Sequence, residues 1–415
     1  MASHAAATKP SVLRSRPLAA LLTAEVLSTT GSQMTWIALP WFVLTTSGPA
    51  HMAFVVAAEA GGYALFGIPS GALLERLGSQ RTMRLCDSVR APLMLLVPVL
   101  HWTGDLSLPT LIALTFVLGA AGTPYNAAQH VVVAEILDED EASVERANAL
   151  LQGAQRLTML GGPAIGGILI AIVGAPVVLV VDAATYLVAF VLVTLLVPVA
   201  GAPHEDETED DRALLSGVRY VLHDSLLRGW MTALVLGDTS FGVIFVAIPV
   251  VVFAHYGADP RLAGALIASW GTGAVVGNVA AYRSDRVGGL SQAPSLVLVQ
   301  ATPLWALALP LPAAAVAGSL ALSGLGNGLV NPTLHAFLTL RPPAAIRAKA
   351  LTAMSTASAI GGPIAIAAAG PAFKAFGSRH VVAVAAAGQL LAMCYAALVT
   401  VRHLARERHL AQEHA

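Results

Sequence analysis

Two stretches of this sequence, RANALLQGAQRLTMLGGP at residues 146–163 and RAKALTAMSTASAIGGP at residues 347–363, begin and end alike. Both continue as apolar segments after the shared Gly-Gly-Pro. Further matches occur in the same order at shifts of 200 to 210 residues, namely TAEVL (23–27) over TALVL (232–236) and ERLG (75–78) over DRVG (285–288). An ordered series of matches indicates an internal repeat, so we expect two similar halves in parallel orientation.

The composition indicates that most of the protein surface does not face water. Of the 415 residues, 56% are hydrophobic and only 11% are charged, whereas soluble proteins carry about 25% charged residues. The net charge of -1 argues against a nucleic-acid-binding protein, which needs a positive surface. The two cysteines, Cys86 and Cys394, are too few for a disulfide framework. These features predict a membrane protein.

The apolar stretches are long enough for transmembrane helices, which need about 20 residues each. Polar and turn-forming residues divide the chain into twelve of them: 17–46, 52–74, 84–103, 108–137, 148–173, 176–200, 228–254, 260–283, 291–313, 316–340, 348–373 and 379–401. The fold class is therefore predicted as all-α and integral to the membrane. We expect a six-helix half at 1–200, an acidic cytoplasmic connector at 201–227 and a second six-helix half at 228–415.

Most of the 23 Lys and Arg residues lie in segments on one side of this topology. The positive-inside rule assigns that side to the cytoplasm, so both termini are expected there, with the chain in the inner (plasma) membrane. Parallel six-helix repeats are typical of transporters that hold substrate near the midplane between the halves and expose it alternately to each side.

The segment GALLERLGSQR (71–81) resembles the loop between the second and third spans of the major facilitator superfamily. GGPAIGG (161–167) is similar to the antiporter motif in the fifth span of that superfamily, with Gly162, Pro163, Gly166 and Gly167 matching. Residues 124–190, which contain Asp182 within DAATYL, resemble the exporter branch with macrolide-efflux and siderophore-export proteins. The resemblance implies a drug/proton antiporter that acts as a monomer on a small-molecule substrate in the lipid bilayer.

The resemblance also implies a conformational latch, formed at the cytoplasmic ends of neighbouring helices when the transporter opens outward. Its residues here are Gly71, Glu75, Arg76, Gly78 and Arg81, with Asp285 and Arg286 in the second half. The alternative is an ordinary charge pair at a helix end, which contributes about 0.3–1 kcal/mol. For the antiporter motif we expect close backbone packing at the glycines and a kink at Pro163.

Acidic residues inside spans are the candidates for proton coupling, because a charge at the bilayer centre costs about 2.5–3.5 kcal/mol. Glu25 is the first candidate, Asp238 the second and Asp182 a third. A purely structural role for Glu25 is the alternative. Asp87 lies three residues before Arg90, which favours a structural ion pair on one helix face.

Polar and aromatic residues in the spans that border the cavity in this superfamily are the candidates for substrate contact. Asn126 with His130, and Asn331 with His335, each share a helix face at a spacing of four. Gln33, Trp36 and Phe245 are further candidates for the cavity wall. Arg156 needs either an acidic partner in its own half or a polar substrate.

No nucleotide-binding, zinc-protease or serine-hydrolase motif occurs in the sequence. We therefore expect no enzymatic activity, metal or cofactor, and no nucleic-acid partner. The favoured function is export of small amphiphilic compounds, of the kind that confers antibiotic resistance, in exchange for protons. The alternatives are a narrow-range metabolite or siderophore exporter, a proton-coupled importer, and a membrane receptor or scaffold.

Overall fold

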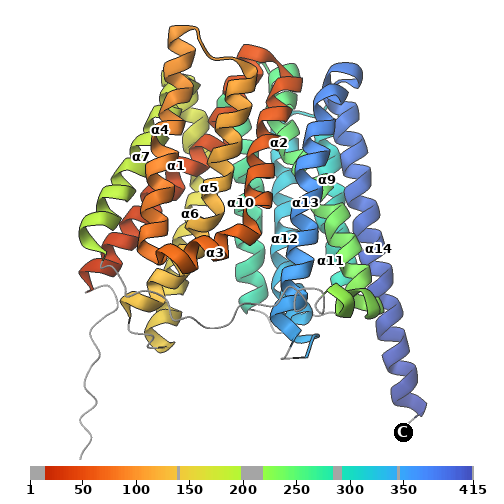
Figure 1. The fold of residues 1–415 in the computed structure, drawn as a ribbon. Coiled ribbons are helices and arrows are strands. Elements are labelled where there is room, and N and C mark those ends of the chain that lie inside the picture. Colours follow the sequence, from red (N-terminus) through yellow and green to blue (C-terminus); the bar gives the residue numbers. More distant parts are fainter. Residues whose placement is uncertain (1–14, 138–140, 198–217, 284–291, 344–345, 414–415) are drawn as a thin grey trace, which may run out of the picture.

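The computed structural model describes residues 15–137, 141–197, 218–283, 292–343 and 346–413. Helices occupy each of the twelve stretches expected from the sequence (Figure 1). In the first half they are α1 (Arg16–Ser47), α2 (Pro49–Leu65), α3 (Gly67–Leu77), α4 (Ser79–Thr103), α5 (Leu108–Ile136), α6 (Glu141–Val173) and α7 (Ala175–Leu196). In the second they are α9 (Ser225–His255), α10 (Pro260–Arg283), α11 (Ala293–Ala301), the 3₁₀ helix η2 (Thr302–Ala308), α12 (Ala313–Leu340), α13 (Arg347–Phe376) and α14 (Ser378–Glu413).

Eight of the described helices are long and apolar enough to cross a membrane, or nine if the bent pair of α2 and α3 is one span. The helices α1 and α4 fall short of that hydropathy test, and both carry polar side chains that face the interior. The fold is therefore a bundle of mostly apolar helices, two of which combine apolar residues with polar side chains that face the interior.

Two of the expected spans differ from straight helices. The stretch predicted as one helix at 52–74 bends by 61° between α2 and α3, and the Phe66 ring at the bend packs edge-on against Phe116, 6.5 Å between ring centroids. The stretch predicted at 291–313 changes to a 3₁₀ helix after Ala301 and becomes extended at Leu309. Pro310 and Pro312 follow, and a proline disfavours helical backbone in the preceding residue.

The two halves have equivalent short junctions and pack together through four helices. Gly174 joins α6 to α7 and Gly377 joins α13 to α14, both with positive φ (84° and 81°), a conformation that glycine adopts without strain. Across the two halves, α6 packs against α10 and α2 against α13. The helix α1 begins and α14 ends at the same end of the bundle (Figure 1), which we call the terminal end; the opposite end is the far end.

Candidate functional site

A cavity of about 1710 Å³ lies between the two halves. It is lined by the first parts of α1, α9 and α13 and the second parts of α2, α5 and α12. These are the parts of each helix nearer the terminal end, so the cavity opens toward that end. Its acidic and basic side chains are Glu25, Glu59, Arg90, Arg156 and Asp238, and the His130 imidazole also lines it.

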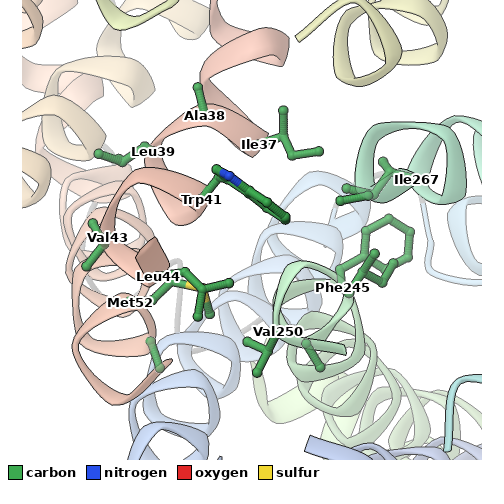
Figure 2. Close-up of a cluster of buried hydrophobic side chains, with 14 of the residues drawn as sticks. Ile37, Ala38, Leu39, Trp41, Val43, Leu44, Met52, Phe245, Val250 and Ile267 are labelled. Carbon is green, nitrogen blue, oxygen red and sulfur yellow. The ribbon is translucent and has the colours of Figure 1, made fainter. Parts of the chain in front are cut away.

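Apolar side chains close the far end of the bundle above the cavity. Figure 2 shows Trp41 from α1 pointing toward Phe245 and Val250 of α9 and Ile267 of α10, within one buried cluster. Each of these four side chains is less than 9% exposed. This buried contact between apolar side chains of the two halves lies on the far-end side of the cavity.

Glu25 lies in the cavity wall and is only 4% exposed. Its carboxylate accepts hydrogen bonds from the Thr29 hydroxyl at 2.8 Å and the Gln155 amide at 3.2 Å. The Tyr125 hydroxyl donates to the other oxygen at 3.5 Å. α1, α5 and α6 therefore all contribute to one carboxylate site, which is bordered by the cavity on one side.

A buried charge cluster lies beside Glu25. Asp87 is fully buried, and its carboxylate lies 3.8 Å from the Arg90 guanidinium. The guanidinium makes its short hydrogen bond to the Tyr186 hydroxyl, at 2.7 Å, and its carbon lies 4.0 Å from the centre of that ring and 5.3 Å from the Tyr125 ring. The expected ion pair of Asp87 and Arg90 is thus present, but the Tyr186 hydroxyl makes the closer contact to the arginine.

Asp182 lies behind the cavity wall rather than in it. Its carboxylate accepts hydrogen bonds from Thr35 of α1 at 2.6 Å and from Thr185 at 3.2 Å, and the side chain is fully buried. A Cβ on Gly31 would lie 2.3 Å from the Asp182 oxygen, so glycine at that position permits the contact. The geometry makes Asp182 a link between α1 and α7.

The second half contributes fewer charged groups. Asp238 lies in the cavity wall and accepts a hydrogen bond from the Ser358 hydroxyl of α13. The Asn331 amide donates to the Asn327 side chain at 3.0 Å within α12. Among the polar groups that the described residues place on this side of the cavity, most are therefore amides and hydroxyls.

The structure places Gln33, Trp36, Asn126, His130, Arg156 and Asn331 in the cavity wall. The Asn126 amide donates to the Tyr63 hydroxyl at 3.0 Å. The acidic partner expected for Arg156 is not present among the described residues, where this guanidinium makes no ion pair. The side chain of His335 lies outside the described residues.

The prediction that Phe245 faces the cavity is wrong. Phe245 is 6% exposed and packs behind Trp36, with 5.7 Å between ring centroids. Phe241, one helical turn earlier, lines the cavity instead and lies 4.5 Å from the Phe245 ring. Phe245 thus supports the aromatic floor formed by Trp36 and Phe241 without being part of its surface.

Several wall residues were missed by the sequence reasoning. Glu59 was not among the candidate residues, but it lines the cavity, and within the described part of the chain its carboxylate makes no hydrogen bond or ion pair. Five glutamines also line the cavity: Gln129, Gln152, Gln155, Gln300 and Gln389. The glutamines could have been identified from the sequence, because an uncharged amide in an apolar span, like a charged group, requires a polar partner or water.

The latch residues of the first half are apart in this conformation. Glu75, Arg76 and Arg81 are exposed, and the described residues contain no ion pair of Glu75 with either arginine. Asp285 and Arg286 lie outside the described residues. Gly71 lies within α3 with no neighbour near its Cβ position, and Gly78 makes the turn to α4 at φ 79°.

The two residues that follow Gly78 have a role that the sequence reasoning did not identify. The Ser79 hydroxyl donates to Glu135 of α5. The Gln80 amide donates to the carbonyl oxygens of Val193, at 3.1 Å, and Val197, at 2.6 Å, at the end of α7. These bonds fasten the start of α4 to its neighbours in the same half.

The glycines of the antiporter motif allow close helix contacts. A Cβ on Gly162 would lie 2.3 Å from the Gln33 Cβ, and one on Gly166 would lie 3.0 Å from the Met34 Cα, so both face α1. A Cβ on Gly167 would lie 2.5 Å from the Pro260 oxygen of the other half. Pro163 lies inside α6, and its carbonyl oxygen would be 2.3 Å from a Cβ on Gly264 of α10.

The chain is similar to known proteins along most of its length. The family model described as Major Facilitator Superfamily matches residues 21–366. The multidrug efflux pump Tap of Mycobacterium tuberculosis is 28% identical over 380 residues, which cover 87% of this chain and 88% of that protein. The protein of the same name from Mycolicibacterium fortuitum is 26% identical over 379 residues, covering 87% and 90%.

A solved structure of a mutant of the nucleoside transporter NupG has a TM-score of 0.75, with 12% sequence identity and coverage of 92% of this chain and 99% of that one. A likeness at this identity concerns the fold alone. It agrees with the helical membrane bundle described above.

Proposed function

Since the chain belongs to the Major Facilitator Superfamily, we propose that it exports small amphiphilic compounds by alternating access, in exchange for protons. The observation that carries the proposal is the cavity of about 1710 Å³, which combines three carboxylates with an aromatic floor and is closed at the far end. The relatives named as multidrug efflux pumps support export. Because the family is one of transporters, we propose that the chain transports compounds and does not catalyse a reaction.

The proposed orientation puts the terminal end in the cytoplasm and the chain in the plasma membrane. Support comes from the Lys and Arg residues, most of which precede, follow or join helices at that end. In this orientation the cavity is open to the cytoplasm, which is the state that takes up a compound for export. The two six-helix halves, 1–200 and 228–415, are proposed to rock about the cavity, with the acidic connector 201–227 on the cytoplasmic side.

We assign the proton exchange first to Glu25 and second to Asp238. In the cytoplasm-facing state Glu25 releases its proton and its carboxylate is held by Thr29 and Gln155. A bound compound then replaces part of the water near this charge. After the halves rock, a proton from the outer side neutralises the carboxylate and weakens the attraction for the compound. Asp182, which lies behind the wall, is proposed to position α1 rather than to meet the compound.

The cavity favours a broad range of compounds. Pockets for drug-sized ligands are about 300–1,000 Å³, and this one is larger. Trp36 and Phe241 offer apolar faces, and the surrounding amides can donate or accept hydrogen bonds in many directions. Because one chain encloses the whole cavity, we propose a monomer whose partners are the bilayer, protons and the transported compound.

The test is a panel of amphiphilic antibiotics and dyes applied to cells that express the protein. We expect lower accumulation of several chemically different compounds, and we expect the difference to disappear when an ionophore collapses the proton gradient. Lower accumulation of a single metabolite would favour a narrow-range exporter. Higher accumulation would indicate an importer and contradict the proposal.

A further inference from the structure

A second, smaller hollow lies on the outer surface of the bundle, away from the central cavity. It measures about 410 Å³ and is lined by Arg81, Arg84, Leu85 and Ser88 of α4 and by Phe190 of α7. The four α4 residues follow one another at spacings of three, one and three, so they share one face of the helix. We call this hollow the α4–α7 groove.

The exposed face of α4 changes character along its length. Beyond the groove, the same helix exposes large apolar side chains toward its end: Leu95, Leu96, Val99 and Trp102. α7 runs antiparallel to α4, with Phe190 beside Arg84, so the part of α7 at the level of this apolar end is its beginning, where Val177 and Val181 are exposed. A charged segment followed by an apolar one matches the two parts of a phospholipid, namely its headgroup and its acyl chains.

The length of α4 places the groove at the level of the headgroups. Arg84 and Trp102 are 18 residues apart in one helix, which corresponds to about 27 Å at 1.5 Å per residue. The hydrocarbon core of a bilayer is about 30 Å thick. Because tryptophan is enriched at the membrane interface, Trp102 marks one interface, and the two arginines lie at the opposite one.

Within the described part of the chain, no acidic side chain forms an ion pair with the positive charge of the groove. Among the described residues, neither Arg81 nor Arg84 forms an ion pair. The Arg84 guanidinium carbon lies 5.9 Å from the centre of the Phe190 ring, which positions it beside the groove. The Ser88 hydroxyl donates to the Leu85 carbonyl oxygen at 2.8 Å, so it remains able to accept a further hydrogen bond.

We propose that the α4–α7 groove binds the headgroup of an anionic phospholipid, with the phosphate held by Arg81 and Arg84 and the acyl chains lying along the apolar part of α4 and α7. Guanidinium groups bind phosphate through charge-assisted hydrogen bonds. The described residues that line the groove include two arginines and no carboxylate that could accept the ammonium of a zwitterionic headgroup, so their charge complements a net negative lipid such as phosphatidylglycerol. None of the groove residues lines the central cavity.

The test uses the full-length protein in detergent, with phosphatidylglycerol or phosphatidylcholine added and the bound lipid measured by native mass spectrometry. The variant Arg81→Gln/Arg84→Gln removes both groove charges. The matched control Arg219→Gln/Arg283→Gln removes the same charge from two exposed arginines outside the groove. With about 1 kcal/mol for each arginine near an anionic headgroup, we expect phosphatidylglycerol binding to weaken by roughly tenfold or more in the groove variant only.

Three results would overturn the proposal. The first is equal weakening in the groove variant and the control, which would indicate diffuse attraction. The second is equal retention of phosphatidylcholine and phosphatidylglycerol by the unmodified protein. The third is displacement of the lipid by millimolar inorganic phosphate alone, which would indicate a site for the free anion. A folded monodisperse peak in size-exclusion chromatography for both variants establishes that the comparison concerns binding.

Discussion

Arg90 lies beside a group of buried acids and tyrosines in the first half. Its guanidinium lies 3.8 Å from the carboxylate of Asp87 and 2.7 Å from the hydroxyl of Tyr186. Removing one partner of a buried ion pair leaves an uncompensated charge, which typically costs about 3–5 kcal/mol. We therefore expect Arg90→Gln to lower the thermal unfolding midpoint of the purified protein strongly, while Arg76→Gln, at an exposed position, leaves it nearly unchanged.

A double-mutant cycle separates the ion pair from the packing of the arginine. The double variant Asp87→Asn/Arg90→Gln removes both charges, so it should be more stable than Arg90→Gln alone. If the double variant is the less stable of the two, the charge interaction is not the reason for the loss.

Asp224 connects the beginning of α9 with the segment after α12. Its carboxylate accepts hydrogen bonds from the backbone N–H groups of Leu226, at 2.9 Å, and Leu227, at 3.1 Å, and forms an ion pair of 3.2 Å with Arg341. Although partial burial acts to raise the pKa of Asp224, these hydrogen bonds and the arginine lower it below its ordinary value. A lowered pKa in the folded state means that the carboxylate stabilises the protein when it is ionised.

This stabilisation is present above the pKa of the unfolded chain, about 3.9, and is lost as the pH falls through the lower folded value. We expect Asp224→Asn to lower the unfolding midpoint slightly at pH 7, and the difference from the unmodified protein to shrink below about pH 4. The measurement is a series of thermal unfolding curves between pH 3 and 7. A difference that stays constant across this range would contradict the assigned cause.

At the scale of the element, α6 depends on glycine where it touches α1. A Cβ on Gly162 would lie 2.3 Å from the Gln33 Cβ, whereas its repeat mate Gly362 has nothing within 4 Å. Overpacking of this kind typically costs about 1–3 kcal/mol. Gly162→Ala should therefore lower the thermal midpoint and the export activity, and the matched variant Gly362→Ala should leave the thermal midpoint unchanged. Equal effects of the two substitutions would show that the close contact does not matter.

The elements themselves follow from the sequence more directly than their shapes do. Each of the twelve apolar stretches contains a helix, because a backbone in lipid must satisfy its hydrogen bonds within the segment. The 61° bend between α2 and α3 was not predicted. That bend lies where Phe66 packs on Phe116 of α5, a tertiary contact that no local pattern reveals. The helix within the stretch 291–313 ends early, and this could be predicted from the sequence because Pro310 and Pro312 lie just after the point where it ends.

At the scale of the whole molecule, the two halves meet at the far end through backbone contacts of α6 with α10. A Cβ on Gly264 would lie 2.3 Å from the Pro163 carbonyl oxygen. We expect Gly264→Val to separate the two helices and to shift the population toward a conformation open at the far end. The matched variant Gly318→Val introduces the same side chain where nothing lies within 4 Å.

Electron paramagnetic resonance can measure this shift with spin labels at the far-end positions 105 and 259, which belong to different halves. The exposed Cys394 would first be replaced by Ser. The account predicts a longer distance between the labels for Gly264→Val only. An unchanged distance would show that the contact does not hold the far end closed.

The polar residues of the cavity wall were predicted better than the helix face that each span turns toward the cavity. Polar residues in apolar spans identified Gln33, Asn126 and His130, because such groups avoid lipid, and the structure places all three in the wall. The same reasoning failed to separate Phe241 from Phe245. α9 is apolar around most of its circumference, so the sequence holds little information about which face meets the cavity. Only the packing against α10, where Trp270 contacts both rings, decides it.

The central claim is that a compound leaves through this cavity in exchange for a proton carried by Glu25. Inside-out membrane vesicles that are acidified by respiration test it directly, with a fluorescent pH probe in the lumen. We expect an amphiphilic antibiotic added outside the vesicles to release luminal protons. Glu25→Gln should abolish this release at equal expression. Asp105 is an acid outside the cavity, so Asp105→Asn should preserve the release. Undiminished proton release by the Glu25→Gln variant would contradict the account.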